Sequence, residues 1–157
     1  MEKHTRSSEV VSDYRSVKKE LNETRDCTVT ATAVSFGVSY KQAHTFLSET
    51  FGRQHGKGIP FSVKIDEQPN VKLNGKKFHK VDIKELKYPG SNRFIREQNK
   101  NQLNIVKMPL SKIQEKFNEG TYLVLVKGHA LAMKDGVIVD ENGYHQRRKV
   151  MNLYKIE

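Results

Sequence analysis

The N-terminal half of the chain contains two adjacent segments in which apolar residues recur at helical spacing. In the first, residues 27–36, one stripe runs from Cys27 to Val34 at intervals of three and four residues. Asp26 stands where a helix N-cap is expected, and Gly37 stands where a left-handed stop is expected. The pattern therefore predicts a helix with Cys27 at its N-terminus.

The second segment begins at Ser39, whose spacing from Gln42 is that of a capping box. The apolar residues that follow share one helical face and are Ala43, Phe46, Leu47 and Phe51. We expect this helix to end near Gly52. Residues 1–20 are polar, with a few apolar residues at helical spacing, and we interpret them as a lead-in to the domain.

The C-terminal third has the pattern of a short helix followed by a strand. Ser111 is the expected cap of a helix that runs through Phe117 and is stopped by Gly120. Residues 121–126 are apolar on both faces, which is typical of a strand in the middle of a sheet.

A hairpin is the clearest signal in the chain. Residues 129–134 and 137–142 flank the pair Asp135-Gly136, which a two-residue turn prefers. Residues 151–156 are predicted to form a closing strand. Together with the two helices, these strands predict an α+β fold.

The middle of the chain is harder to interpret. Residues 52–60 contain three glycines and a proline and are predicted to form a loop. Residues 62–107 are polar and basic, with a hairpin expected at Asn74-Gly75, and we interpret them as an insert. Because a chain of 157 residues rarely splits its core, we expect residues 1–157 to form one domain.

Charge adds a question about partners. The chain carries 28 basic and 18 acidic residues, a net charge of +10, which by itself favours nucleic-acid binding. The excess is concentrated in residues 62–100, with ten basic and five acidic residues, and in residues 145–157, with four and one. No nucleic-acid-binding motif accompanies either segment, so non-specific nucleic-acid binding through 62–100 stays an alternative to an acidic protein partner.

Cys27 is the single cysteine, which excludes an internal disulfide and a thiolate-rich metal site. At a helix N-terminus its thiolate is stabilised, and a nearby histidine completes a nucleophile and base pair. With Asp135-Gly136 as the turn, His129 lies opposite Asn142 and diagonal to Asp140 on one face of the hairpin. Either of these two residues is placed to orient the imidazole.

These residues resemble a known family. The Asp-Cys pair at 26–27, Gly-His-Ala-Leu-Ala at 128–132 and Asp-Gly-Val-Ile-Val-Asp at 135–140 look like the papain-like cysteine peptidases. The likeness is to small single-domain members, such as the peptidase domains of bacteriocin exporters and similar phage and bacterial proteins. It implies an α+β fold in which the N-terminal Cys helix packs on a C-terminal antiparallel sheet.

The resemblance also implies roles for individual residues. Cys27 becomes the nucleophile, His129 the general base and acid, and Asp140 the orienting residue of a triad acting on a peptide or isopeptide bond. Family members carry a Gln before the Cys that builds the oxyanion hole. The corresponding stretch here contains Asn22, to which we assign that role together with the Cys27 backbone N–H.

A second function from a different class is open at this point. The chain is alternatively an inactive papain-like binding protein, a phage host-takeover factor whose basic surface holds nucleic acid or an acidic host protein. Under the peptidase hypothesis the partner is a polypeptide substrate. The oligomeric state is left open by the sequence.

The remaining histidines do not suggest a metal centre. His44 lies among apolar residues and is expected to be structural, while His55, His79 and His145 stand in polar segments. We therefore expect no metal and no cofactor. No apolar run is long enough for a membrane span or a secretory signal, so we expect a cytoplasmic protein, in the host cytoplasm if its origin is a phage.

Overall fold

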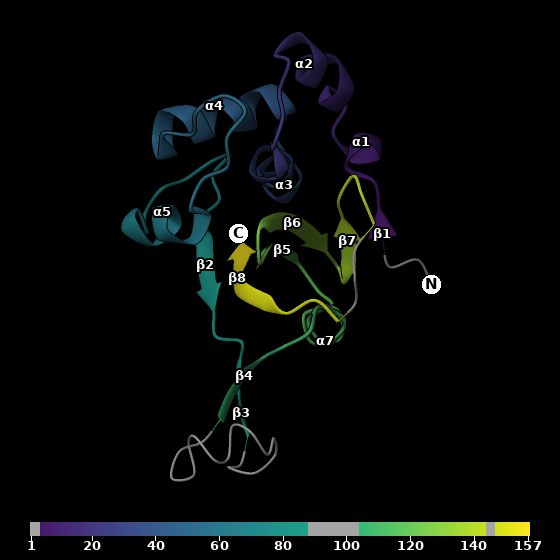
Figure 1. The fold of residues 1–157 in the computed structure, drawn as a ribbon, viewed down its shortest axis with the longest axis vertical. Coiled ribbons are helices and arrows are strands. Elements are labelled where there is room, and N and C mark those ends of the chain that lie inside the picture. The colour runs from purple at the N-terminus through teal and green to yellow at the C-terminus, as the bar shows by residue number, and fades with distance from the viewer. Residues whose placement is uncertain (1–3, 88–103, 144–146) are drawn as a thin grey trace.

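The computed structural model describes residues 4–87, 104–143 and 147–157, and it is an α+β structure (Figure 1). The helices are α1 (Ser7–Val10), α2 (Tyr14–Glu20), α3 (Cys27–Phe36), α4 (Tyr40–Phe51), α5 (Phe61–Glu67) and α7 (Leu110–Lys116). The strands are β1 (His4–Thr5), β2 (Phe78–Val81), β3 (Lys84–Lys87), β4 (Asn104–Lys107), β5 (Thr121–Val126), β6 (His129–Lys134), β7 (Val137–Val139) and β8 (Val150–Ile156).

The main sheet has six strands in the order β1-β7-β6-β5-β8-β2, while β3 and β4 pair separately. Its neighbours are antiparallel except for β1, which runs parallel to β7. The prediction of an antiparallel C-terminal sheet is therefore wrong in two respects. The sheet is mixed, and both of its edge strands come from outside the C-terminal third. Short strands such as β1 carry too few residues for a pattern to be seen in the sequence.

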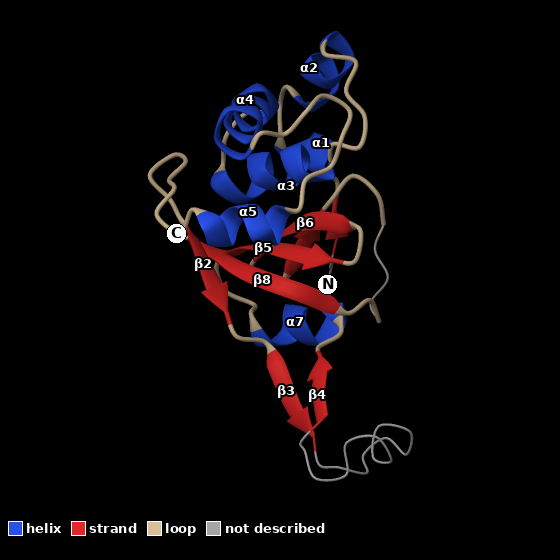
Figure 2. Ribbon diagram, turned by 60° about the vertical axis from the view of Figure 1, so that its left-hand side comes forward, coloured by secondary structure: helices blue, strands red, loops and turns tan. Residues whose placement is uncertain are grey.

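Helices α3, α4 and α5 lie on one side of the sheet and α7 lies on the other (Figure 2). One hydrophobic cluster lies between the sheet and helices α3, α4 and α5, and includes Phe36, Leu47 and Leu123. The other lies between the sheet and α7, and includes Ile113 and Leu153. Strand β5 contributes alternate residues to both clusters, which is why its sequence is apolar on both faces.

Helices α3 and α4 have the predicted bounds. Gly37 ends α3 in the left-handed conformation, with φ 67°, and the Ser39–Gln42 capping box of α4 is present. Asp26 occupies the N-cap position of α3, but its side chain makes no capping hydrogen bond. Helix α4 has 12 residues, and no helix in the described ranges is long and apolar enough to cross a membrane.

Helix α7 begins two residues earlier than predicted. Its N-cap is Pro109, and no side chain caps it, so Ser111 lies inside the first turn and is not a cap. Gln114 of this helix donates its side-chain N–H to the carbonyl of Gly136, 3.0 Å away, and so ties α7 to the β6–β7 turn.

Part of the region interpreted as an insert belongs to the main sheet. Strand β2 pairs with β8 along its whole length, and α5 covers the same face as α3. The turn at Asn74-Gly75 is present, with both residues at positive φ and flanked by a single bridge between Leu73 and Lys76. Residues 88–103 of this region lie outside the described ranges.

Two turn glycines give a matched test of the close contact between α7 and the sheet. Both have positive φ, but a Cβ on Gly136 would lie 3.1 Å from the backbone oxygen of Gln114, whereas one on Gly75 meets nothing within 4 Å. We expect Gly75→Ala to lower the free energy of unfolding by about 1 kcal/mol and Gly136→Ala by about 2–3 kcal/mol, because only the second must also displace α7. Urea denaturation measures the free energy of unfolding of both variants. Equal losses would contradict the close contact between Gly136 and Gln114 of α7.

Candidate active site

Cys27 is the first residue of α3, which packs against β6 and β5. The first backbone bond of the helix runs from the Thr30 N–H to the Asp26 carbonyl, so the N–H groups of the preceding residues have no helical partner. Asp26 does not cap them either, because its carboxylate accepts from Tyr40 and Lys18 instead. The open first turn leaves partial positive charge beside the Cys27 thiol.

His129 begins β6, and Asp140 follows the end of β7. The hairpin has the predicted register, with Lys134 opposite Val137, and it brings His129 Nε2 to 2.9 Å from Asp140 Oδ2. The backbone of Asp140 is held in turn by β1, since its N–H donates to the Thr5 carbonyl. Side-chain exposure is 25% for His129 and 9% for Asp140.

The choice between Asp140 and Asn142 that the sequence left open is decided by where β7 ends. The strand stops at Val139, so its pairing with β6 does not continue to Asn142, which is exposed. Asp140 is the residue bonded to the imidazole.

Cys27 and His129 alter each other's pKa. Burial raises the pKa of the Cys27 thiol, but hydrogen bonds with the His129 ring and with the Ala130 N–H outweigh it, and the pKa lies below its ordinary value. The hydrogen bond with Asp140, followed by that with Cys27, raises the pKa of His129 to about 9. Because Nε2 faces Asp140, Nδ1 is the ring nitrogen left for the thiol. Both shifts favour the charged form of their group, a thiolate at Cys27 and an imidazolium at His129.

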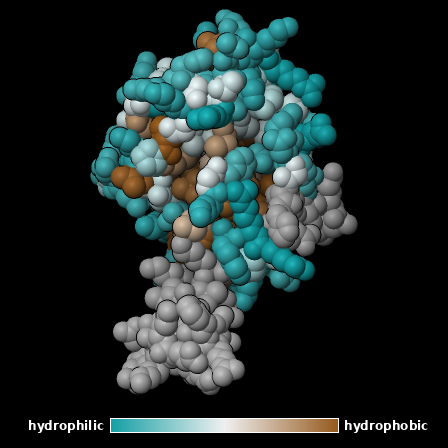
Figure 3. All heavy atoms as spheres, viewed as in Figure 1, coloured by the Kyte–Doolittle hydropathy of each residue, from teal (hydrophilic) through white to brown (hydrophobic). Residues whose placement is uncertain are grey.

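A hollow of about 560 Å³ opens over Cys27 and His129. Its walls come from residues 58–62 of the loop and α5, from 125–130 around the β5–β6 turn, and from 151–152 of β8. Most of these side chains are apolar, and Figure 3 shows hydrophobic side chains gathered in the middle of the face seen in Figure 1, among hydrophilic ones. The site therefore has room for part of a ligand larger than water.

Asn22 is not brought to this group. It is exposed and lines a separate hollow beside α2 with Lys18 and Lys19. The backbone of Asn22 explains this position, because Asn22 has φ 50° and ends α2. The Asn22 N–H donates to the Lys19 carbonyl, and the Glu23 N–H donates to the Lys18 carbonyl. This is the Schellman pattern, in which Asn is one of the few residues that tolerate the left-handed position. In the structure Asn22 therefore ends α2. Its side chain does not line the hollow over Cys27, so it does not fill the predicted oxyanion role.

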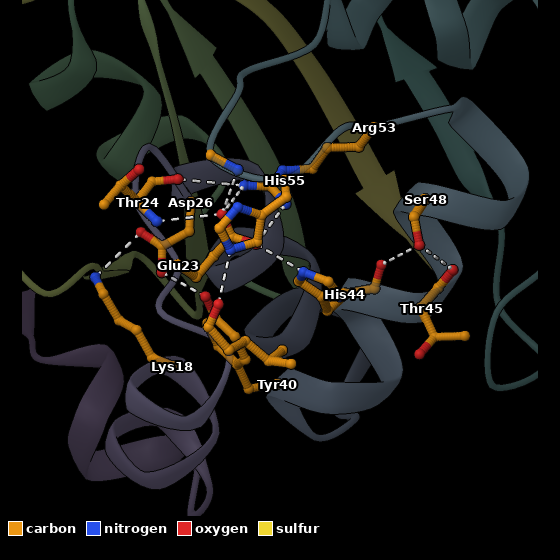
Figure 4. Close-up of polar contacts among 12 residues, drawn as sticks. Lys18, Glu23, Thr24, Asp26, Tyr40, His44, Thr45, Ser48, Arg53 and His55 are labelled. Carbon is orange, nitrogen blue, oxygen red and sulfur yellow. Dashed lines mark hydrogen bonds and ion pairs between the residues drawn. The ribbon is translucent and has the colours of Figure 1, made fainter.

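Glu23 is a buried residue that the sequence did not single out as important, and it organises the segment before Cys27 (Figure 4). Arg53 holds its carboxylate with two hydrogen bonds of 3.0 and 3.1 Å. His44 Nε2 lies 2.7 Å from Oε2, and the Gly56 N–H donates to Oε1 at 2.7 Å. Burial raises the pKa of Glu23, but the bonds from Arg53, His44 and Gly56 outweigh it and lower the pKa to about 2.

This Glu23 clamp joins two walls of the site. On one side it holds residues 23–26, which lead directly into Cys27, and Arg53 Nη2 also reaches the carbonyls of Thr24 and Arg25. On the other side it holds the loop that starts after α4 and supplies residues 58–60 to the hollow. Nothing in the local pattern reveals the clamp, because Glu23 and Arg53 are 30 residues apart and each resembles an ordinary surface charge.

Asp26 forms a second buried contact next to the nucleophile. Its Oδ2 accepts from the Tyr40 hydroxyl at 2.7 Å and its Oδ1 accepts from Lys18 at 3.2 Å. Burial and the bond to Asp26 raise the pKa of Tyr40 well above its usual value, so the phenol stays a donor. The pair connects the start of α3 to the first residue of α4.

The other described histidines have backbone or carboxylate partners, and two of them, His44 and His55, approach Oε2 of Glu23, at 2.7 and 3.9 Å. His44 bonds to Glu23, as a structural residue would, while His55 lies 2.7 Å from the Leu21 carbonyl and His79 lies 3.2 Å from that of Glu157. His145 lies outside the described residues. Among residues 4–87, 104–143 and 147–157, no group of three or more His, Cys, Asp and Glu side chains is arranged to hold a metal ion.

In comparisons with protein-family models, with curated proteins and with solved structures, nothing matches this chain. The interpretation of the site therefore depends on its own geometry and chemistry.

The first prediction for the site concerns the partner of His129. Asp140→Asn removes the largest cause of the raised pKa of His129, so we expect that pKa to fall from about 9 toward the ordinary value of 6.5. NMR titration of the His129 ring protons measures it in the wild type and the variant. Asn142→Ala is the control and should leave the titration unchanged, because Asn142 is exposed and does not contribute to the raised pKa of His129. If the pKa of His129 changed in Asn142→Ala and not in Asp140→Asn, Asn142 and not Asp140 would be the partner of His129.

The second prediction concerns the Glu23 clamp. Arg53→Met leaves the Glu23 carboxylate buried without its cation, and we expect the free energy of unfolding to fall by about 3–5 kcal/mol. The double variant Glu23→Gln/Arg53→Met should recover part of this loss because no charge is then buried. Lys80→Met, which removes an exposed pair with Asp66, is the control and should cost less than about 1 kcal/mol. Urea denaturation gives all three values, and a loss at Arg53 no larger than that at Lys80 counts against the clamp.

Proposed function

We propose that the protein is a cysteine peptidase or closely related thiol acyl-transfer hydrolase, with Cys27 as nucleophile. The observation that carries the proposal is the continuous Cys27–His129–Asp140 arrangement, with a lowered thiol pKa and a raised imidazole pKa, inside a hollow. A structural cysteine would have its pKa raised by burial, with no charge partner to offset it. Strongly perturbed pKa values in paired groups are typical of catalytic sites.

In the acylation step, the Cys27 thiolate attacks the carbonyl carbon of a peptide or isopeptide bond and forms a C–S bond. The carbonyl oxygen takes the negative charge, and backbone N–H groups at the start of α3 are the donors available to it. His129 then gives its Nδ1 proton to the leaving nitrogen as the C–N bond breaks, which releases an amine and leaves a thioester.

In the deacylation step, neutral His129 takes a proton from water, and the resulting hydroxide attacks the thioester carbonyl. The C–S bond breaks, a carboxylic acid leaves, and the proton on His129 restores the ion pair with Cys27. Asp140 acts throughout by holding Nε2, which keeps the ring oriented and stabilises the imidazolium form.

The proposal includes a papain-like arrangement of the fold. It is supported by the order Cys, His, Asp along the chain, by the position of Cys27 at a helix N-terminus, and by the packing of that helix on the strand that begins with His129. The parallel strand β1 and the left-handed Asn22 differ from what the resemblance implied, and they affect the sheet edge and the oxyanion donors.

The alternative of an inactive binding protein on the same scaffold is favoured by one observation, the position of Asn22 outside the hollow. Without the Asn22 amide the oxyanion loses the side-chain donor that the resemblance implied, and each missing donor costs about 10²–10³ in turnover. The two functions differ in their dependence on Cys27, since a pure binder keeps its biological effect as Cys27→Ala.

Thiol reactivity tests the proposal directly, because Cys27 is the single cysteine. At neutral pH we expect iodoacetamide to alkylate Cys27 several-fold faster in the folded protein than in urea, since only the folded state lowers its pKa. His129→Gln should reduce the folded rate, and Asn152→Ala, in the same hollow, is a matched control for access. With a cleaved peptide substrate, His129→Ala should lower kcat/KM by about 10²–10⁴-fold. Equal alkylation rates in the folded and unfolded protein would falsify the activated thiol.

A further inference from the structure

The hollow over Cys27 shares wall residues with two neighbouring hollows. Residues 58–60 also line a second hollow of about 210 Å³, together with Lys57 and Lys64. Residues 151–152 also line a third hollow of about 490 Å³, with residues 80–83. The three hollows together are called the substrate groove, and its shape suits an extended chain better than a compact small molecule.

Charge is distributed unequally along the substrate groove. The second hollow, called the lysine hollow, contains Lys57 and Lys64 and has no acidic residue in its lining. The central hollow contributes a single further lysine, Lys127. The third hollow contains Lys80 together with Asp82, so its charges are mixed. Of the two side hollows, only the lysine hollow therefore has lysines and no acidic residue in its lining.

The lysines of the second and third hollows differ in whether they form ion pairs. Lys80 forms an ion pair with Asp66 at 3.3 Å. Neither Lys57 nor Lys64 forms an ion pair with an acidic side chain in the described part of the chain. Lys64 lies in the last turn of α5, and Lys57 lies in the loop held by the Glu23 clamp, so both are carried on fixed backbone. Their ammonium groups are available to a ligand anion.

We infer that the substrate is an extended polypeptide segment that places an acidic side chain between Lys57 and Lys64 while its scissile carbonyl lies at Cys27. The inference rests on the proposed function and adds a sequence preference to it. Because the lysines are near the surface, the preference is electrostatic and weakens as salt screens it. The apolar central hollow covers the residues between the acidic side chain and the scissile bond.

The experiment measures peptide binding and turnover separately. Fluorescein-labelled peptides carry a central apolar tetrapeptide and two Glu, two Gln or two Lys residues at one end, in both chain directions. Fluorescence anisotropy with Cys27→Ala gives the affinities at about 50 mM and about 300 mM NaCl. We expect the best Glu peptide to bind about threefold to tenfold more tightly than its Gln counterpart at low salt, and the difference to shrink at high salt.

Two charge-reversed double variants, each made in the Cys27→Ala protein, test the assignment of the lysines. Lys57→Glu/Lys64→Glu should abolish or invert the preference for Glu over Gln peptides. Lys116→Glu/Lys134→Glu changes the net charge equally at two exposed positions outside the substrate groove and should retain the preference. Lys57→Gln/Lys64→Gln is a milder form that keeps the test valid if the reversal impairs folding.

The possible outcomes separate the inference from the proposed function. Equal affinity for Glu and Gln peptides, or a preference that survives Lys57→Glu/Lys64→Glu, overturns the inference even if the wild type cleaves peptides. If the preference depends on these lysines but the wild type cleaves none of the peptides, the inference is supported as a binding property and the proposed peptidase function is rejected. Tighter binding of a labelled oligothymidylate that is lost in the same variant overturns the inference in favour of nucleic acid.

Discussion

The buried carboxylate of Glu23 is the constraint on which the site depends. An ionised group without water must find charged and hydrogen-bonding partners inside the protein, and Glu23 finds Arg53, His44 and the Gly56 N–H. To satisfy it, the segment before Cys27 and the loop after α4 must both come to the same point. One electrostatic requirement thus sets the start of α3 and one wall of the hollow together.

The proposed catalytic group is built on this frame from three elements that are far apart in the chain. Cys27 comes from the start of α3, His129 from the start of β6, and Asp140 from the end of β7. Packing of α3 on β6 brings thiol and imidazole together, and pairing of β7 with β1 holds the backbone of Asp140. Each group then shifts the pKa of the next one. The carboxylate stabilises the imidazolium, and the imidazolium stabilises the thiolate.

The same arrangement explains why the helix N-terminus at Cys27 remains open. Asp26 would ordinarily cap the first turn, but its carboxylate is engaged by Tyr40 and Lys18. Uncapped N–H groups beside a thiolate serve the chemistry proposed here, because they offer hydrogen bonds to a developing oxyanion. The cost of leaving them without a side-chain cap is about 1 kcal/mol, which the buried contacts of Asp26 offset.

The sequence by itself determined the features that depend on local spacing. These include the bounds of α3 and α4 and the register of the β6–β7 hairpin, because periodicity and turn residues act over a few positions. Only the tertiary structure decided between Asp140 and Asn142, added β1 and β2 to the sheet, and removed Asn22 from the site. Those outcomes depend on where a strand ends, which edge of the sheet is free to pair, and which charged side chains come into contact in the interior. Such contacts join residues up to 136 positions apart, and no local pattern in the sequence records them.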